Sequence, residues 1–208
     1  MIDLLLPDSI LLSGSYLLAD DTAIGNLLFV HGVGSCKEAY EELMRYYAQK
    51  GINAYAFDMR AHGKSGGEYA TYGYHEKEDI REIVEWIRQN HGSDIPLGIY
   101  GNSMGGAISI QATAEIPQID FAVFESAFAD FPEIVNDYSE RISRGLTMKW
   151  MVNWVLSRAG KIADFVPKEV APERAAVKID KPVLVIHGDA DDRIHVSHAH
   201  RIFDNLSS

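Results

Sequence analysis

The sequence predicts an α/β protein in which helices flank a mostly parallel sheet. From Asn26 onward, short segments that are nearly all apolar alternate with segments in which apolar residues recur at helical spacing. Such strands are typical of a parallel sheet that is covered by helices on both faces. The chain has 208 residues, of which 47% are hydrophobic, so it can form one folded domain with a substantial core.

The expected elements follow this alternation along the chain. Strands are expected at residues 2–6, 10–18, 26–31, 52–58, 96–100, 121–125 and 182–187. Helices with apolar residues three or four positions apart are expected at residues 37–50, 76–90 and 196–206, and a helix rich in small residues is expected at residues 103–115. Parallel neighbours among these strands require right-handed crossovers through the helices.

Residues 127–179 interrupt the alternation of strands and helices. We expect them to form a small helical cap, inserted after the sixth strand into a single domain that spans residues 1–208. The centre of this insertion is strongly apolar and includes Trp150 and Trp154. An apolar stripe at helical spacing indicates either plain core or the roof of a pocket for an apolar substrate, and the sequence leaves both open.

The composition excludes several classes of function. The chain has 19 basic and 30 acidic residues, and its net charge of −11 disfavours binding to nucleic acid. Its single cysteine, Cys36, cannot form a disulfide framework. We expect no membrane span and no export signal, because residues 1–36 lack Lys and Arg and no apolar run is long enough. A cytoplasmic protein is therefore expected.

The strongest functional motif is Gly101-Asn102-Ser103-Met104-Gly105, which fits the pattern G-x-S-x-G. It lies directly between an expected strand and an expected helix. A serine in such a tight turn projects its hydroxyl at the carboxyl edge of the sheet, while the flanking glycines allow the close backbone approach. Ser103 is therefore the candidate nucleophile.

Three further motifs accompany Ser103 in order along the chain. They are the pair His31-Gly32 after a strand, the segment from Asp58 to Ser65, and the segment from His187 to Asp191. Together with the serine motif they resemble the α/β-hydrolase superfamily, and within it a small esterase or acylglycerol lipase-like serine hydrolase. Ala61 departs from the glycine that the family usually has at this point of the second segment.

The resemblance implies a role for several residues. Ser103 would attack a carbonyl carbon and form an acyl-enzyme. The backbone N–H groups of Val33 and Met104 would stabilise the oxyanion. Asp191 would be the acid of the catalytic triad, and Glu125 is the alternative because some relatives place the acid after that strand. His31 and His62 are expected to stiffen the surrounding loops, and Asp58 and Arg60 are expected to be structural.

The general base is missing from the matched motifs. The family's histidine follows the acid, in a loop after a final strand. Only 17 residues follow Asp191, and the expected helix takes up residues 196–206, so we expect this strand and its histidine to be absent from these 208 residues. His195 is the weak candidate by chain order, whereas His198 and His200 lie further along the helix. A metal site formed by these three histidines is not expected.

The sequence therefore predicts hydrolysis of carboxylic esters with an apolar acyl group, and less strongly of thioesters or peptides. No motif implies a cofactor or a metal. The missing histidine leaves two alternatives open, a non-catalytic binding protein with the same fold and a piece of a longer hydrolase. The open sheet edge after the last strand further predicts self-association.

Overall fold

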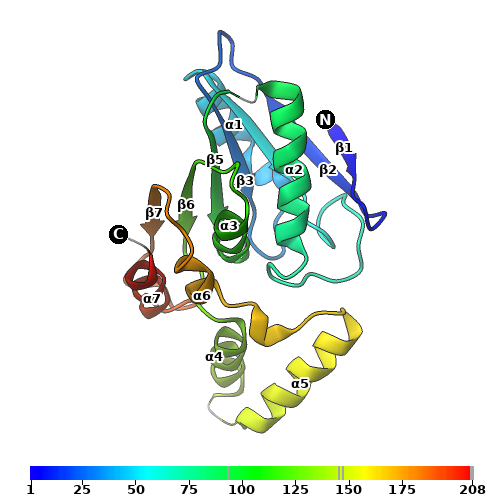
Figure 1. Cartoon of the computed structure of the whole chain (residues 1–208). Helices are drawn as coiled ribbons and strands as arrows, with labels where there is room; N and C mark the ends of the chain where they lie inside the picture. The colour runs from blue at the N-terminus through cyan, green and yellow to red at the C-terminus, as the bar shows by residue number, and fades with distance from the viewer. Residues whose placement is uncertain (93, 145, 147, 207–208) are drawn as a thin grey trace.

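The computed structural model describes residues 1–92, 94–144, 146 and 148–206. Its centre is a seven-stranded sheet in the order β1-β2-β4-β3-β5-β6-β7 (Figure 1). The strands are β1 (Ile2–Leu5), β2 (Leu11–Leu17), β3 (Gly25–Val30), β4 (Ile52–Phe57), β5 (Leu97–Asn102), β6 (Phe121–Glu125) and β7 (Val183–Ile186). β1, β2 and β4 pair antiparallel, and all later pairs are parallel, which confirms the predicted sheet.

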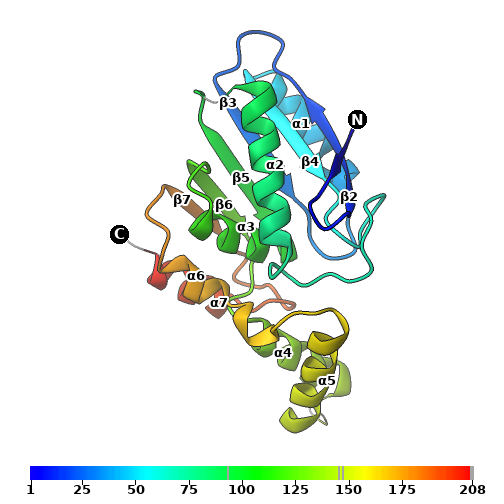
Figure 2. The same ribbon diagram turned by 45° about the vertical axis from the view of Figure 1, so that its right-hand side comes forward.

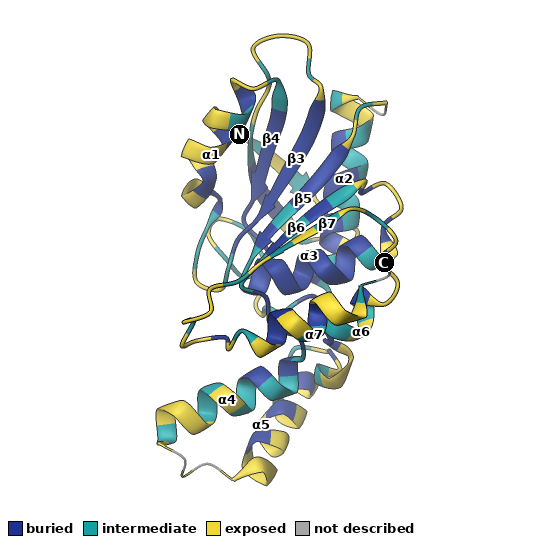
Figure 3. Ribbon diagram, turned by 90° about the vertical axis from the view of Figure 1, so that its left-hand side faces the viewer, coloured by how far each residue is buried: buried dark blue, intermediate teal, exposed yellow. Residues whose placement is uncertain are grey.

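The helices cover both faces of the sheet. They are α1 (Glu41–Ala48), α2 (Glu76–His91), α3 (Met104–Glu115), α4 (Phe131–Ser143), α5 (Lys149–Ile162), α6 (Pro172–Ala176) and α7 (Ser197–Asn205), with short 3₁₀ turns η1 (Lys37–Tyr40) and η2 (Pro167–Glu169). Helix α1 lies on one face, and α2 and α3 lie on the other (Figure 3).

The apolar spacing in the sequence explains these positions. Helix α2 buries one stripe, formed by Ile80, Ile83, Val84 and Ile87, each of which is fully buried. Helix α3 has no such stripe because it is buried on all sides. Ten of its residues are buried, and several of them are small, such as Gly105 and Ala107. The small side chains let α3 lie close to the sheet, and this places the start of α3 at the carboxyl end of β5.

Helices α4 and α5 form a hairpin that projects beyond the carboxyl ends of the strands (Figure 2). Asp130 caps α4, because its side chain accepts a hydrogen bond from the Glu133 amide at 3.0 Å. The hairpin lies within residues 127–179, whereas α6 in the same segment packs against α3. The boundaries of a cap insertion in a single domain therefore stay a prediction.

The last strand of the sheet, β7, has only one neighbouring strand among the described residues. Leu184 and Ile186 on this strand are 55% and 41% exposed. In the described part of the chain β7 is followed by α7 and by no further strand. Self-association through this edge stays a prediction. No described helix has the length and apolar character that are needed to span a membrane.

Candidate active site

Ser103 occupies a sharp turn between β5 and α3. Its backbone has φ 55° and ψ −118°, a conformation that non-glycine residues rarely adopt. The turn is held by a hydrogen bond of 2.8 Å from the Ser103 amide to the carbonyl oxygen of Glu125. A Cβ at Gly101 would lie 2.2 Å from the carbonyl oxygen of Gly105, so the turn can close only with glycine at position 101. The structure thus places Ser103 in the strained geometry that the motif predicts.

The loop after β3 lies against this turn. A Cβ on Gly32 would be 3.3 Å from the Ser103 Cβ, so the backbone next to Val33 passes close to the serine. In the part of the chain that the structure describes, the Val33 and Met104 amides donate no hydrogen bond to the protein. Met104 is also the first residue of α3. Amides in the first turn of a helix have no acceptor within the helix, and the helix dipole favours an anion at this end. Both amides are therefore available to an oxyanion.

A buried ion pair anchors the far end of this loop. The Lys37 ammonium lies 2.6 Å from the Asp58 carboxylate, and both side chains are fully buried. Asp58 also accepts hydrogen bonds from the amides of Lys37 (2.7 Å) and Lys64 (2.8 Å). Burial raises the pKa of Asp58, but the hydrogen bonds from Lys37 and Lys64 outweigh burial and hold it below its usual value. Asp58 therefore has the structural role that the sequence predicts.

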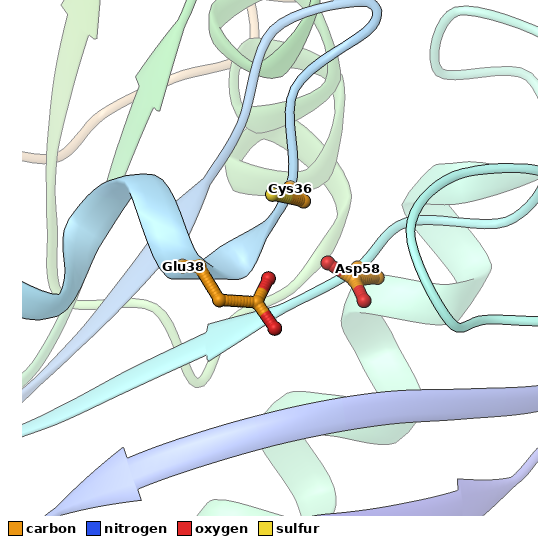
Figure 4. A group of neighbouring side chains, drawn as sticks. All are labelled: Cys36, Glu38 and Asp58. Atoms are coloured by element: carbon orange, nitrogen blue, oxygen red, sulfur yellow. The ribbon is translucent and has the colours of Figure 1, made fainter.

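Figure 4 shows Cys36, Glu38 and Asp58 grouped at the start of η1. Their ligand atoms lie close enough together for a metal ion. However, the Lys37 ammonium is already 2.6 Å from Asp58 and 3.4 Å from Glu38, so it supplies the positive charge at this point. The neighbouring Glu38 carboxylate also raises the pKa of the Cys36 thiol, which disfavours the thiolate that a metal or a nucleophilic role requires. These residues stiffen the loop and do not fit a metal centre.

His31 and His62 stiffen the neighbouring loops, as expected. The His31 Nε2 accepts a hydrogen bond from the Met59 amide at 3.0 Å, and its Nδ1 donates to the Gly32 carbonyl oxygen at 2.8 Å. The His62 ring lies 5.1 Å from that of His31. Arg60 is likewise structural, because it pairs with the buried carboxylate of Asp79. None of these groups reaches the Ser103 cavity that is described below.

Asp191 lies in the loop after β7 and lines the same cavity as Ser103. Its carboxylate accepts hydrogen bonds from the amides of Arg193 (2.8 Å) and Ile194 (3.0 Å). Burial raises the pKa of Asp191, but these hydrogen bonds outweigh it and hold the pKa below its usual value. His187 fixes the loop, since its Nε2 donates to the Ile194 carbonyl oxygen at 2.6 Å and lies 3.6 Å from the Asp191 carboxylate. Asp191 is thus a preorganised carboxylate.

Glu125, the alternative acid, ends β6 and lines the same cavity. Its carboxylate accepts a hydrogen bond from the Tyr100 hydroxyl. Burial together with this carboxylate raises the pKa of Tyr100 far above its usual range, so the tyrosine stays a donor. Both carboxylates line the cavity that Ser103 also lines, but the loop around Asp191 offers its carboxylate two amide donors, whereas the Glu125 carboxylate is engaged by the Tyr100 hydroxyl.

No histidine is among the described residues that line the Ser103 cavity. The exposed His195 bonds to the Ser197 hydroxyl at 2.9 Å at the start of α7. His198 is buried on α7, where its Nδ1 accepts from the Ala129 amide at 3.1 Å and its Nε2 lies 3.6 Å from Asp137. His200 is exposed on the same helix. The three histidines after Asp191 are therefore not gathered at the site.

His198 makes stability depend on pH. Burial lowers the pKa of His198 below 6.5, although the carboxylates of Glu133 and Asp137 oppose this effect and Arg201 reinforces it. The folded state therefore favours the neutral ring, and protonation as the pH falls below 6.5 favours the unfolded state. We expect the free energy of unfolding to fall between pH 7.5 and 5.5, and to fall less in His198→Asn. Urea titrations at both pH values measure the difference, with the exposed His200→Asn as control. An equal loss in all three proteins would contradict this role.

Two cavities meet at Ser103. The first has a volume of about 540 Å³ and includes the polar side chains of Ser35, Asn102, Glu125 and Asp191 in its wall. The second has about 460 Å³ and is mainly apolar; it is lined by Met104 and by residues of the cap, among them Phe128, Phe131, Ile134, Val135 and Tyr138. Val33 and Ser103 line both cavities. A carbonyl at Ser103 would thus have an apolar space on one side and a polar space on the other.

The sequence did not reveal Arg193 as a wall residue of both cavities. Arg193 lies in a loop, where the direction of a side chain follows no periodicity, so no pattern in the sequence indicates that it faces the cavities. Tyr138 on α4 also lines both cavities. Trp150 and Trp154, which the sequence places in the apolar centre of the insertion, line neither cavity and are each 66% exposed.

Comparison with known proteins identifies the family. A model of the family described as serine aminopeptidase, S33, matches residues 21–171, from just before β3 to the start of α6. The chain belongs to the serine aminopeptidase S33 family. The predicted resemblance to the α/β-hydrolase superfamily is confirmed by this match and by the solved structures that share the fold.

Relatives of this S33 chain include proteins with and without an assigned activity. It is 30% identical over 204 residues to the uncharacterized protein YqkD of Bacillus subtilis, covering 93% of this chain and 63% of YqkD. It is 23% identical over 219 residues to a monoacylglycerol lipase of Mycolicibacterium smegmatis, covering 88% and 76% of the two chains. The chain spans about three-fifths of the length of YqkD and of the Escherichia coli protein YfhR.

The fold is shared with a solved esterase. The Pyrococcus furiosus esterase Pf2001 superposes with a TM-score of 0.77 at 24% identity, covering 98% of this chain and 76% of the esterase. At this identity the likeness shows a shared fold.

Proposed function

We propose that this S33 family member is a serine hydrolase that cleaves carboxylic esters through an acyl-enzyme on Ser103. One observation carries the proposal. Ser103 sits on a strained turn between two free amides and shares one cavity with the Asp191 carboxylate. The names of two relatives, an esterase and a monoacylglycerol lipase, support the same class of reaction.

In the proposed reaction the Ser103 Oγ bonds to the carbonyl carbon of the ester, and its proton passes to a base. The carbonyl oxygen becomes an oxyanion that accepts hydrogen bonds from Val33 and Met104, each of which lowers the barrier by about 3 kcal/mol. When the tetrahedral intermediate collapses, the alcohol leaves with the proton. A water molecule then hydrolyses the acyl-enzyme by the same steps and regenerates the serine. The Asp191 carboxylate would orient and stabilise the protonated base.

The cavities indicate how the substrate would lie. The apolar cavity beneath the cap suits an acyl chain, because its wall carries the rings of Phe128, Phe131 and Tyr138. The polar cavity suits the alcohol group that leaves. Thioesters and peptides remain less favoured substrates of the same mechanism.

The proposal is tested with a fluorophosphonate probe, which phosphonylates an activated serine. We expect the probe to label the protein and the label to vanish in Ser103→Ala. Because the described cavity lacks a histidine, labelling is expected to be faster in a buffer that contains imidazole, which can act as the base. Asn102→Ala, next to the serine, is the matched control and is expected to keep the label. Absence of labelling both with and without imidazole would overturn the proposal.

The second candidate function is a binding protein that retains the fold without catalysis. The histidine-free lining of the described cavity favours it. Without the base, a serine hydrolase keeps only about 10³–10⁴-fold rate enhancement from the oxyanion hole and binding. Under this alternative, an apolar ester would bind in the cavity beneath the cap while Ser103 would remain unlabelled under both conditions.

A further inference from the structure

Helix α5 has two apolar faces, of which only one is packed. Val152, Leu156 and Gly160 are buried against the rest of the cap. On the other side Trp150 and Trp154 are each 66% exposed, and Met151 and Val155 are 46% and 51% exposed. An exposed side with two tryptophans is unusual for a helix of a soluble domain, because indole rings gain free energy when they leave water.

The exposed side of α5 is also basic. Arg158 and Lys161 lie between these apolar residues, within an arc of about 140° at 100° per residue. We call Trp150, Met151, Trp154, Val155, Arg158 and Lys161 the outer face of α5. Between Arg141 and Lys161 the sequence holds five basic residues and no acidic one, although the whole chain carries a net charge of −11. The positive charge is thus concentrated where the apolar side chains are exposed.

Apolar rings and basic side chains on one helix face are typical of a helix that lies in the interface of an anionic membrane. Indole rings settle at the level of the headgroups, and Lys and Arg pair with the lipid phosphates. A second copy of this chain fits the outer face less well, because two such faces in contact would bring like charges together.

We propose that the outer face of α5 binds the surface of an anionic lipid bilayer. The hairpin of α4 and α5 projects from the domain, so the face can reach a flat surface without obstruction by the sheet (Figures 1 and 2). The inner side of α5 packs on α4, and α4 lines the apolar cavity through Phe131, Ile134 and Val135. Binding in this way brings the apolar cavity close to the lipid.

Flotation with vesicles tests the proposal. We expect the protein to float with vesicles of phosphatidylglycerol and phosphatidylcholine. With vesicles of phosphatidylcholine alone, we expect it to remain in the bottom fraction of the gradient. The double variant Arg158→Gln with Lys161→Gln is expected to partition about 30-fold more weakly, since each basic residue near an anionic surface contributes about fivefold. The double variant Trp150→Ser with Trp154→Ser is expected to bind the vesicles at least about tenfold more weakly than the parent protein.

Matched controls lie on other helices. Arg45→Gln with Lys50→Gln removes two basic residues at α1, and Tyr46→Ser with Phe203→Ser removes two exposed rings on α1 and α7. These variants, and Ser103→Ala, are expected to float like the parent protein, so the readout is independent of hydrolysis. Equal flotation of all variants, or no flotation, would overturn the proposal. One further result would assign the outer face to a second copy of the chain. In it, the parent protein does not float with vesicles but sediments as a dimer, and both double variants of α5 sediment as monomers.

Discussion

Replacement of Lys37 by methionine is expected to lower the free energy of unfolding by about 3–5 kcal/mol. Methionine fills a similar space, so the main effect is to leave the Asp58 carboxylate buried without its ammonium partner at 2.6 Å. Two backbone amides still bond to Asp58, but they do not neutralise its charge. The loop that carries Val33 ends at this anchor, and we therefore also expect slower labelling of Ser103. Urea unfolding measures the first effect and the fluorophosphonate probe the second.

The matched control is Lys77→Met. Lys77 pairs with Glu115 at 2.9 Å, but these side chains are 27% and 35% exposed, so its loss is expected to cost about 0–1 kcal/mol. Adding Asp58→Asn to Lys37→Met removes the uncompensated charge and is expected to recover part of the stability. If Lys37→Met and Lys77→Met unfold at the same urea concentration, the buried pair does not have the role assigned to it.

The fold could be predicted because the strands and helices obey simple periodicities. The sequence between residues 26 and 125 alternates buried strands with helices, and every element expected there is present within a few residues. Ser103 was found because its motif stands between such a strand and such a helix. Asp191 depended on the resemblance to a family, because the acidic loop after β7 also holds Asp189 and Asp192 and spacing alone does not choose among them.

The remaining features depend on contacts between distant segments. Lys37 is followed by Glu38 and two residues later by Tyr40, and nothing in this local pattern indicates a lysine with a fully buried side chain. Its partner Asp58 is 21 residues away and is brought near by the parallel pairing of β3 and β4. The sequence left open whether Trp150 and Trp154 line a pocket, because helical spacing shows that residues share a face but not which of two apolar faces is packed; in the structure they line neither cavity at Ser103.

Replacement of Gly105 by alanine is expected to destabilise the protein by about 3 kcal/mol or more and to abolish labelling of Ser103. Gly105 lies in the first turn of α3, where helix propensity alone would make alanine more stable by about 1 kcal/mol. A Cβ at this position, however, would lie 2.0 Å from the Val30 carbonyl oxygen and 2.7 Å from that of His31. Both contacts are with backbone atoms at the end of β3, so they cannot be relieved by rotation of a side chain.

The direction of the change in stability therefore decides between the two effects. A more stable Gly105→Ala protein would mean that helix propensity dominates, and a less stable one that the close packing of α3 on β3 dominates. Relief of the clash requires the start of α3 to move away from β3, and this movement would carry Ser103 and the Met104 amide away from the Val33 loop. Gly188→Ala is the control, because a Cβ there meets no atom within 4 Å, and it is expected to change stability by about 0.5 kcal/mol or less. Urea unfolding of both variants gives the comparison. A Gly105→Ala protein that is as stable as the parent and still labelled would show that the approach of α3 to β3 does not position the nucleophile.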